Sequence, residues 1–427
     1  MKSNVLVFPA GEINSVELHD ALSNNVNIEV FGASSKERHG SYVFKNYRGG
    51  LPLITDDSFI AALNQLIKEW HIDFIFPTHD TVSLFLAKKQ SEIHAKVIVA
   101  DIYTAEVCRS KKKTYQLFKE YGFCPEQYEN FNHLPCFIKP DDGQGAVGAK
   151  IIHSAHDIPE NFDFEEYVIM ELLPGDEMTV DCLTDYHGNL CAVLPRKRLR
   201  LFSGVSVAGV NVKCDEEVKG IAESINSRLK FFGLWYFQIK RDYNGKYKLL
   251  EISTRCAGTM CLSRARGINL PLLSVYTAQG KDISVFENPY TVVMDRTLIS
   301  RYKMDYDYST VYIDYDDTVV SGECTIPSVI RYLYQCKNQH KKIILITRHN
   351  EDHEDELYQS LYQHCIFPAL FDQIISLSFK QEKVDFIDPL GAIFIDNSFA
   401  ERKKVFDKYA IPVFDVEGIE VLLDWRE

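Results

Sequence analysis

Several features that define other protein classes are missing from this chain of 427 residues. No uncharged apolar run approaches the roughly 20 residues that a membrane-spanning helix needs. The segment from Met1 to Gly11 is short and broken by Pro9, without the long apolar stretch and small-residue cleavage site of a signal peptide. We therefore expect a cytoplasmic protein with no membrane partner.

Patterned cysteine and excess positive charge are lacking too. The eleven cysteines are odd in number and include no C-x-x-C pair, so neither a zinc site nor a disulfide framework is a good interpretation. The formal net charge of -13 argues against nucleic acid as the main partner. Internal repeats and low-complexity tracts are also absent.

What is present is the composition of a globular protein, with 46% hydrophobic and 25% charged residues. A chain of this length exceeds one ordinary hydrophobic core, which predicts two or three domains. Three segments with different periodicities follow one another along the sequence.

The first segment alternates short apolar strands with helices. Strands that recur with helices between them pair in parallel, which predicts a small Rossmann-like doubly wound layer to about residue 105. The expected strands are Asn4–Phe8, Asn27–Phe31, Asp73–Phe76 and Lys96–Val99, and the expected helices are Ser15–Leu22 and Ser58–Trp70.

The middle segment, from Phe137, contains strand pairs separated by turn signals, an α+β pattern of antiparallel sheet. Tyr186–Asn189 divides one pair and Tyr243–Lys246 divides another. The second turn holds Asn-Gly, the strongest short hairpin signal. Helices are expected at Lys111–Tyr121 and Asp215–Phe231.

The third segment returns to buried strands with helices between them, which again predicts a parallel sheet covered by helices. Its strands are expected at Val311–Ile313, Ile343–Ile346 and Ala392–Ile395, and its helices at Ile326–Lys337 and Asp355–His364. The polar stretch Asp295–Ser309 contains the expected domain boundary.

A glycine-rich stretch, Gly143–Gly148, matches G-x-G-x-x-G. In a dinucleotide site a helix follows this motif. Here Ala149–His153 alternates apolar and polar residues and predicts a strand, so the loop joins two antiparallel strands. Backbone N–H groups in such a loop can bind phosphate, and Lys139 would add a positive charge. A flexible surface turn with a chance lysine is the alternative.

Four other motifs accompany this loop in a fixed order. They are Ser110-Lys111 opening a helix, Glu165–Glu177, Gln238–Lys240 and Leu249–Arg255. With them the chain resembles the ATP-grasp superfamily, and in particular carbamoyl-phosphate-synthase-like carboxylate ligases, over residues 1–285. The resemblance implies a Rossmann-like pre-ATP-grasp domain at 1–105 and an ATP-grasp domain at 106–295.

The resemblance also implies roles for individual residues. Lys111 and Lys139 would hold nucleotide phosphates under a lid that contains Gly143, Gly145 and Gly148. Adenine would meet the hinge at Glu171 and Leu173, and the ribose would meet Glu177. Magnesium, or manganese in its place, would be bound by Gln238, Glu251 and Ser253, although the family usually has asparagine where Ser253 stands. Arg255 would hold the transferring phosphoryl group or the substrate carboxylate.

The implied reaction is activation of a small-molecule carboxylate by ATP as an acyl phosphate, which an amine then attacks. A kinase-like enzyme without ligation is an alternative, because a fold does not fix the acceptor. The basic run Arg196–Arg200 either lines an anionic pocket or is a solvated charge run. A homodimer is a further expectation.

A second chemistry begins at Asp314, where a hydrophobic strand ends in D-x-D-x-T. Two aspartates spaced in this way can divide labour: Asp314 attacks phosphorus, and Asp316 donates and removes protons. With the later motifs this segment resembles the haloacid dehalogenase (HAD) superfamily. The resemblance implies a HAD-like Rossmannoid domain at 305–427 with no room for a large cap.

In that family, phosphate would be bound by Thr318, Thr347 and a lysine that is either Lys380 or Lys383. Magnesium would be held by Asp314, Asp316 and Asp396, and the substrate would be a phosphorylated metabolite of the same pathway. Asn397 stands where a second acid often occurs. The alternative is therefore a non-catalytic phosphate-binding or regulatory module attached to a working ligase.

Overall fold

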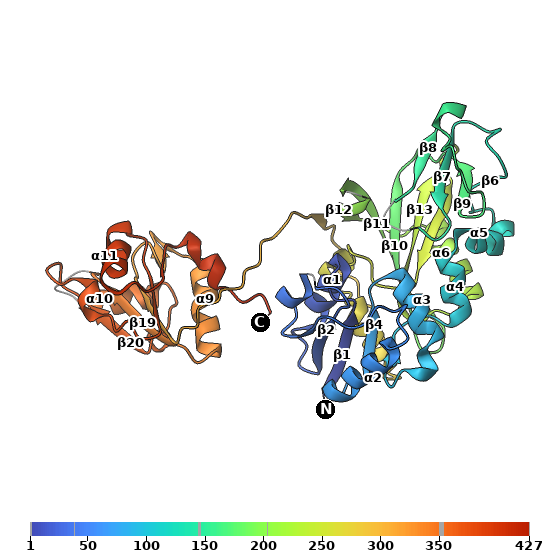
Figure 1. Ribbon diagram of the computed structural model, residues 1–427. Helices are drawn as coiled ribbons and strands as arrows, with labels where there is room; N and C mark the ends of the chain where they lie inside the picture. The colour runs from blue at the N-terminus through green and yellow to red at the C-terminus, as the bar shows by residue number, and fades with distance from the viewer. Residues whose placement is uncertain (1, 38, 144–146, 203, 350–353, 427) are drawn as a thin grey trace. The chain divides into compact units, whose positions relative to one another are not determined.

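The computed structural model describes residues 2–37, 39–143, 147–202, 204–349 and 354–426. The chain divides into two compact units, Met1–Leu298 and Ile299–Glu427 (Figure 1). Within the described residues, no helix has the length and apolar character needed to cross a membrane.

The first unit begins with a parallel five-stranded sheet ordered β3-β2-β1-β4-β5 (Figure 1). Residues of one strand alternate between two cores: Val5 and Val7 pack toward α1, while Leu6 and Phe8 pack toward α2 and α3. The predicted strands and helices are confirmed, and β3 is an addition too short to carry an alternation signal. The elements are β1 (Ser3–Phe8), α1 (Ile13–Leu22), β2 (Ile28–Ala33), β3 (Asn46–Arg48), α2 (Phe59–Trp70), β4 (Phe74–Pro77), α3 (Asp80–Lys88) and β5 (Lys96–Val97).

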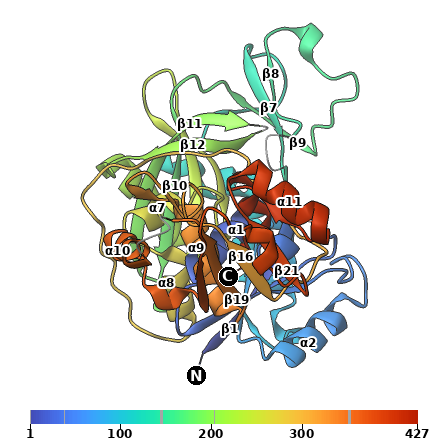
Figure 2. The same cartoon turned by 90° about the vertical axis from the view of Figure 1, so that its left-hand side faces the viewer.

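Two antiparallel sheets follow in the same unit, as the turn signals predict. The small sheet is ordered β6-β9-β7-β8 and the large one β14-β13-β10-β11-β12-β15; Figure 2 shows β7 and β8 standing above β11 and β12. The small sheet contains β6 (Gln127–Tyr128), β7 (Cys136–Pro140), β8 (Lys150–Ile152) and β9 (Tyr167–Glu171). The large sheet contains β10 (Glu177–Thr184), β11 (Leu190–Phe202), β12 (Val205–Asn211), β13 (Gly233–Arg241), β14 (Tyr247–Ser253) and β15 (Val293–Asp295).

The helices around these sheets are α4 (Ile102–Arg109), α5 (Lys111–Phe118), α6 (Glu216–Arg228), α7 (Cys261–Ala265) and α8 (Leu270–Ala278). The helix predicted at Lys111–Tyr121 tightens into a 3-10 turn over its last three residues and stops at Gly122, whose φ is 77°. The prediction of Asp215–Phe231 runs too far, because the backbone is extended at Leu229 and Phe231 enters the core beneath Trp235.

The large sheet has two chemically different faces. Met178, Val180 and Cys182 of β10 pack with α6 in one hydrophobic core. Glu177 and Thr179, which alternate with these residues along β10, face a cavity on the other side. This alternation follows from the two-residue period of a strand. It gives the large sheet a polar face toward the cavity and an apolar face toward the core.

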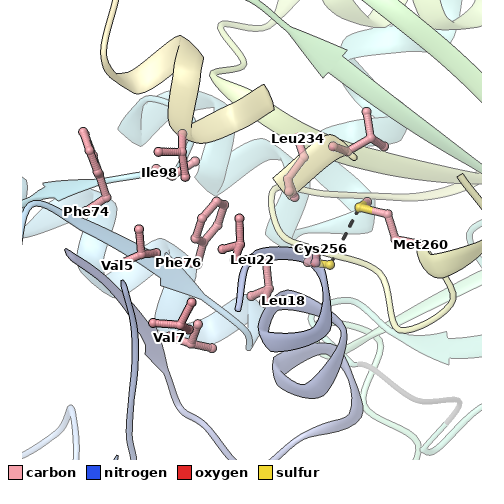
Figure 3. Close-up of a cluster of buried hydrophobic side chains, with 14 of the residues drawn as sticks. Val5, Val7, Leu18, Leu22, Phe74, Phe76, Ile98, Leu234, Cys256 and Met260 are labelled. Carbon is pink, nitrogen blue, oxygen red and sulfur yellow. Dashed lines mark hydrogen bonds between the residues drawn. The ribbon is translucent and has the colours of Figure 1, made fainter. Parts of the chain in front are cut away.

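The parallel sheet and the large sheet share a hydrophobic core. Figure 3 shows Val5, Phe76 and Leu18 on the side of the parallel sheet, together with Leu234 and Met260 from the part that follows. Cys256 lies in the same cluster, 3.7 Å from the sulfur of Met260. This shared core fixes the end of β4 close to the end of β14.

The second unit is built on a parallel sheet ordered β20-β19-β16-β21-β22. Val311 and Ile313 pack toward α9 and α10, whereas Tyr312 packs toward α11. The predicted strands and helices are present, and only the hairpin β17-β18 and α9 lie between β16 and β19. The elements are β16 (Thr310–Ile313), β17 (Val320–Ser321), β18 (Cys324–Thr325), α9 (Pro327–Asn338), β19 (Lys342–Thr347), α10 (Glu354–Gln363), β20 (Gln373–Ser376), β21 (Ala392–Ile395), α11 (Phe399–Tyr409) and β22 (Val413–Phe414).

We predict that the two units fold independently, because each hydrophobic cluster of the described residues lies wholly inside one unit. Fragments 1–298 and 299–427 should each give a cooperative thermal transition in circular dichroism, at a temperature close to that of the same transition in the full chain. An unfolded fragment would contradict this division.

Candidate functional site

A cavity of about 710 Å³ in the first unit opens between the small sheet and the polar face of the large sheet. Phe137 and Lys139 of β7 border it on one side, and Glu177, Thr179 and Gln238 border it on the other. Asn14, at the start of α1, and His79, between β4 and α3, also border it. The cavity is therefore assembled from all three sheets of the unit.

Two of the predicted phosphate-binding lysines meet at this cavity. Lys139 is buried and donates to the carbonyl of Leu250 at 2.9 Å. That carbonyl is available because β13 and β14 change register at this point, which leaves Leu250 without a partner in the ladder. Lys111, at the start of α5, donates to the carbonyls of Asp141 and Gly143 at 3.0 and 2.9 Å.

The surroundings of both lysines lower their pKa values. Burial, followed by repulsion from Lys111, lowers the pKa of Lys139 to about 7. Burial also lowers the pKa of Lys111. A negatively charged ligand that enters the cavity would therefore stabilise the protonated form of both lysines.

Candidate oxygen ligands border the same cavity as these lysines. Gln238 of β13 and Glu251 of β14 are directly paired in the sheet, and both border the cavity. Ser253 differs from the expectation for a metal ligand: it is buried, and its hydroxyl donates to Asp80 at 2.6 Å. The geometry thus brings together Gln238 and Glu251 but commits Ser253 to another partner.

Asp80 was missed by the sequence analysis. It is the first residue of α3, directly after β4, and its carboxylate accepts from Arg255 at 2.8 Å as well as from Ser253. Burial raises the pKa of Asp80, but Arg255 and the hydrogen bonds outweigh it, so the pKa lies below its usual value. The sequence signal that could have identified Asp80 is its position just after a strand, because polar side chains at the carboxyl ends of parallel strands commonly form binding sites.

The remaining predicted nucleotide residues lie at the start of β10 and on and after β9. Glu177 pairs with Arg198 on β11, and Leu173 is buried in a cluster with Tyr115, Val168 and Met170. Glu171 accepts a hydrogen bond from the backbone of Glu126 at 2.9 Å.

Glycine is required in the loop between β7 and β8. At Gly148 φ is +75°, and a Cβ there would meet Pro140 at 2.8 Å; at Gly143 the corresponding distance is 2.9 Å. Gly145 lies outside the described residues. Close approach to Pro140 therefore constrains the loop at both Gly143 and Gly148.

The second unit has a polar cluster at the carboxyl edge of its sheet. Asp314 follows β16, Thr347 ends β19 and Asp396 follows β21, three neighbouring strands. The ammonium of Lys383 lies 2.7 Å from Asp314 and 2.6 Å from Asp396. Burial raises the pKa of Asp314, with Lys383 opposing and Asp396 adding to the shift.

This geometry distinguishes the two candidates for the phosphate-binding lysine. Lys383 is buried at the cluster, whereas Lys380 is exposed. The Thr347 hydroxyl is buried and has no hydrogen-bond partner in the described part of the chain. The Thr318 hydroxyl accepts from the backbone N–H of Asn397 at 3.0 Å, which ties the first motif to the last.

His349 is a further residue that the sequence analysis missed. Its Nδ1 lies 2.9 Å from both carboxylate oxygens of Asp316. Asp316 is exposed, unlike Asp314. Asp316 is thus oriented by a partner that follows β19 by two residues.

Neither unit forms a complete protein-only metal site, since no cluster of three His, Cys, Asp or Glu side chains in the described ranges could hold an ion. This donor set still suits magnesium, which typically takes one or two carboxylates and completes its shell with phosphate and water. In the first unit Glu251 and Gln238 supply oxygen only. In the second unit Asp314, Asp316 and Asp396 do the same.

Comparison with known proteins shows what the first unit resembles. Residues 163–298 match the family described as "ATP-grasp in the biosynthetic pathway with Ter operon". No curated protein sequence matches the chain. The match and the sheets around the cavity show that the first unit has the ATP-grasp fold, a mixed α/β arrangement.

Solved structures agree with this fold. N5-carboxyaminoimidazole synthetase from Staphylococcus aureus, complexed with ADP, is 14% identical with a TM-score of 0.58, covering 70% of this chain and 83% of its own. Biotin carboxylase from Campylobacter jejuni is 15% identical with a TM-score of 0.54, covering 67% and 72%. L-amino acid ligase from Bacillus licheniformis is 16% identical with a TM-score of 0.52, covering 65% and 74%.

We predict that ATP binding at pH 8 takes up a proton at Lys139. With a pKa of about 7 the amine is mostly neutral at that pH in the empty cavity, and phosphate favours its charged form. Affinity for ATP should therefore fall as pH rises above 7. Calorimetric titration in two buffers of different ionisation enthalpy measures the uptake.

Lys139→Met should abolish this uptake and weaken ATP binding, without lowering thermal stability in the absence of nucleotide. The folded state already disfavours the charge, so its removal costs the empty fold little. Lys150→Met is the matched control, because Lys150 is exposed on the partner strand β8. Equal proton uptake in Lys139→Met and the parent protein would contradict the assignment.

Proposed function

We propose that the first unit is an ATP- and Mg²⁺-dependent carboxylate–amine ligase that acts through an acyl phosphate. The observation that carries the proposal is the cavity between two antiparallel sheets, which Lys111, Lys139, Gln238 and Glu251 all border. Cations and metal-ligand oxygens in one cavity suit a nucleoside triphosphate with its metal ion. Phosphoryl transfer depends mainly on such positioning and charge neutralisation.

The reaction would run in two displacements. A substrate carboxylate oxygen attacks the γ-phosphorus and ADP leaves; the amine then attacks the acyl carbon, phosphate leaves and the nitrogen loses a proton. Lys111 and Lys139 would hold the phosphates, and Arg255, oriented by Asp80, would hold the acid or the transferring group. Magnesium bound at Glu251 and Gln238 would neutralise phosphate charge.

The neighbouring proteins support carboxylate chemistry. Their names describe a carboxylase, an amino acid ligase and a carboxyaminoimidazole synthetase, and the family's description refers to a biosynthetic pathway. A small-molecule acid and amine are therefore the substrates we propose. The finer likeness to carbamoyl-phosphate synthase stays a prediction, as do the cytoplasmic location and the homodimer.

We predict that Glu251→Gln abolishes magnesium-dependent ADP formation and leaves the protein folded, because the amide is a poorer ligand for a hard cation. ADP release from a panel of carboxylate and amine pairs gives the parent activity. Glu223→Gln, an exposed position on α6, should behave as the parent. Near-normal turnover in Glu251→Gln would mean that this strand does not bind the metal.

For the second unit we propose a HAD-like phosphomonoesterase without a large cap, acting in the same pathway on a phosphorylated metabolite. The supporting observation is the contact of Lys383 with both Asp314 and Asp396 at the ends of adjacent strands. Asp314 would attack phosphorus and expel the alcohol, which Asp316 would protonate. Thr347, Thr318 and Lys383 would hold the phosphate.

A specific observation favours a second candidate, a phosphate-binding or regulatory module without catalysis. Asn397 is exposed beside the cluster where an acid would strengthen the metal site. Glu401, the first acid after Asn397 along the chain, is already paired with Arg348 at 3.2 Å. The phosphatase assay below discriminates the two.

We predict that Asp314→Asn removes phosphate release from a phosphomonoester panel, since an amide is a poor nucleophile. Asp316→Asn should lower it by about 10²-fold or more through loss of the proton donor. Asp385→Asn, at an exposed surface ion pair, is the control. ADP formation by the first unit should be unchanged in all three variants.

Unchanged phosphatase activity in Asp314→Asn would exclude the aspartyl-phosphate mechanism. A parent protein inactive across the whole panel would instead support the binding module.

A further inference from the structure

The basic run on β11 divides between the two sides of the strand. Arg196 and Arg198 border the cavity, whereas Lys197 between them is half-buried and pairs with Asp176 at 2.9 Å. Arg198 already serves Glu177, a residue of the proposed nucleotide site. Arg196 is therefore the cavity-side cation of this run that the ligase proposal does not use.

The surroundings of Arg196 leave its guanidinium incompletely bound. The side chain is only 3% exposed. Its Nε donates to Thr259 at 2.9 Å and its Nη1 pairs with Asp181, which also accepts from Ser263 at 3.0 Å. Its Nη2 is buried and finds no hydrogen-bond acceptor in the described ranges, and Oδ1 of Asp181 is likewise buried without a hydrogen-bond donor there.

If the only role of Arg196 were to join β11 to β10 by its ion pair with Asp181, its Nη2 donor would not be needed. A buried donor without an acceptor costs free energy, so native proteins satisfy nearly all such groups. Arginine binds carboxylate and phosphate through two adjacent N–H groups. A ligand oxygen that enters from the cavity would accept the hydrogen bond that Nη2 of Arg196 lacks.

The spacing from Arg255 limits the size of that ligand. Thr259, which holds Arg196, follows Arg255 by four residues in one loop, so their Cα atoms lie at most about 14 Å apart. Arg255 and Thr259 both border the cavity. A compact molecule can therefore reach both arginines.

We infer that the acid substrate carries a second anionic group, carboxylate or phosphate, which Arg196 and Thr259 bind while Arg255 faces the reacting carboxylate. This subsite rests on the proposed ligase function and narrows its substrate class to small dianionic acids. Lys197, on the opposite side of the strand, provides a matched control.

The test measures binding to the full-length protein in the presence of Mg-ADP, by calorimetry. The dicarboxylates are succinate, glutarate and L-glutamate, compared with butyrate, valerate and L-glutamine. The phosphocarboxylates are 3-phosphoglycerate and O-phospho-L-serine, compared with glycerate and L-serine. The two arms distinguish a carboxylate from a phosphate as the second group.

We expect at least one compound with two anionic groups to bind the parent about tenfold or more tightly than its matched analogue without the second anionic group, the size expected of a charged hydrogen bond. Arg196→Gln should bring this ratio close to one, and Lys197→Gln should leave it unchanged. If Arg196→Gln does not fold, Arg196→Lys, which keeps the charge but not the fork of donors, should lower the ratio.

Two outcomes would overturn the inference: a parent that binds nucleotide but prefers no compound with a second anionic group, or an Arg196 variant that loses affinity equally for compounds with and without that group. The second would assign Arg196 to the structural tie with Asp181. A parent that binds no nucleotide would instead contradict the ligase proposal, so the two failures are distinguishable.

Discussion

Several basic side chains border one cavity in the first unit, and the need to give each of them a partner is the constraint that organises it. Lys111 and Lys139 are held by backbone carbonyls, while Arg196, Arg198 and Arg255 each have a carboxylate partner. Buried charges persist only when they are paired in this way. The cavity is thus ready for a polyanion, which can add contacts to cations already fixed in position.

The second unit obeys the same rule with the signs exchanged. There two buried carboxylates, Asp314 and Asp396, share one lysine. Their arrangement depends on neighbouring parallel strands that end at one edge of a sheet. In the first unit, antiparallel strands with one apolar and one polar face perform the corresponding task. Both solutions hold charge on rigid strands whose opposite faces are packed in a core.

Much of this could be predicted from the sequence because the signals are local. The turn signals at Tyr186–Asn189 and at the Asn-Gly of Asn244 identify antiparallel strands, and the buried runs before Asp314 and Asp396 identify parallel ones. Ordered motifs then point to Lys111, Lys139, Gln238 and Glu251, which the structure brings to one cavity. A residue's own strand and its neighbours in sequence are sufficient for these assignments.

Other features depend on contacts between segments far apart in the chain. Asp80 meets Ser253 and Arg255 across more than 170 positions, because the shared core fixes the end of β4 beside the end of β14. Likewise, Lys383 rather than Lys380 reaches the two aspartates, and Arg196 rather than Lys197 faces the cavity. The sequence by itself determined which strands exist and which side chains alternate on them. Only tertiary packing decided which partner each buried charge acquired, since that depends on where distant strand ends meet.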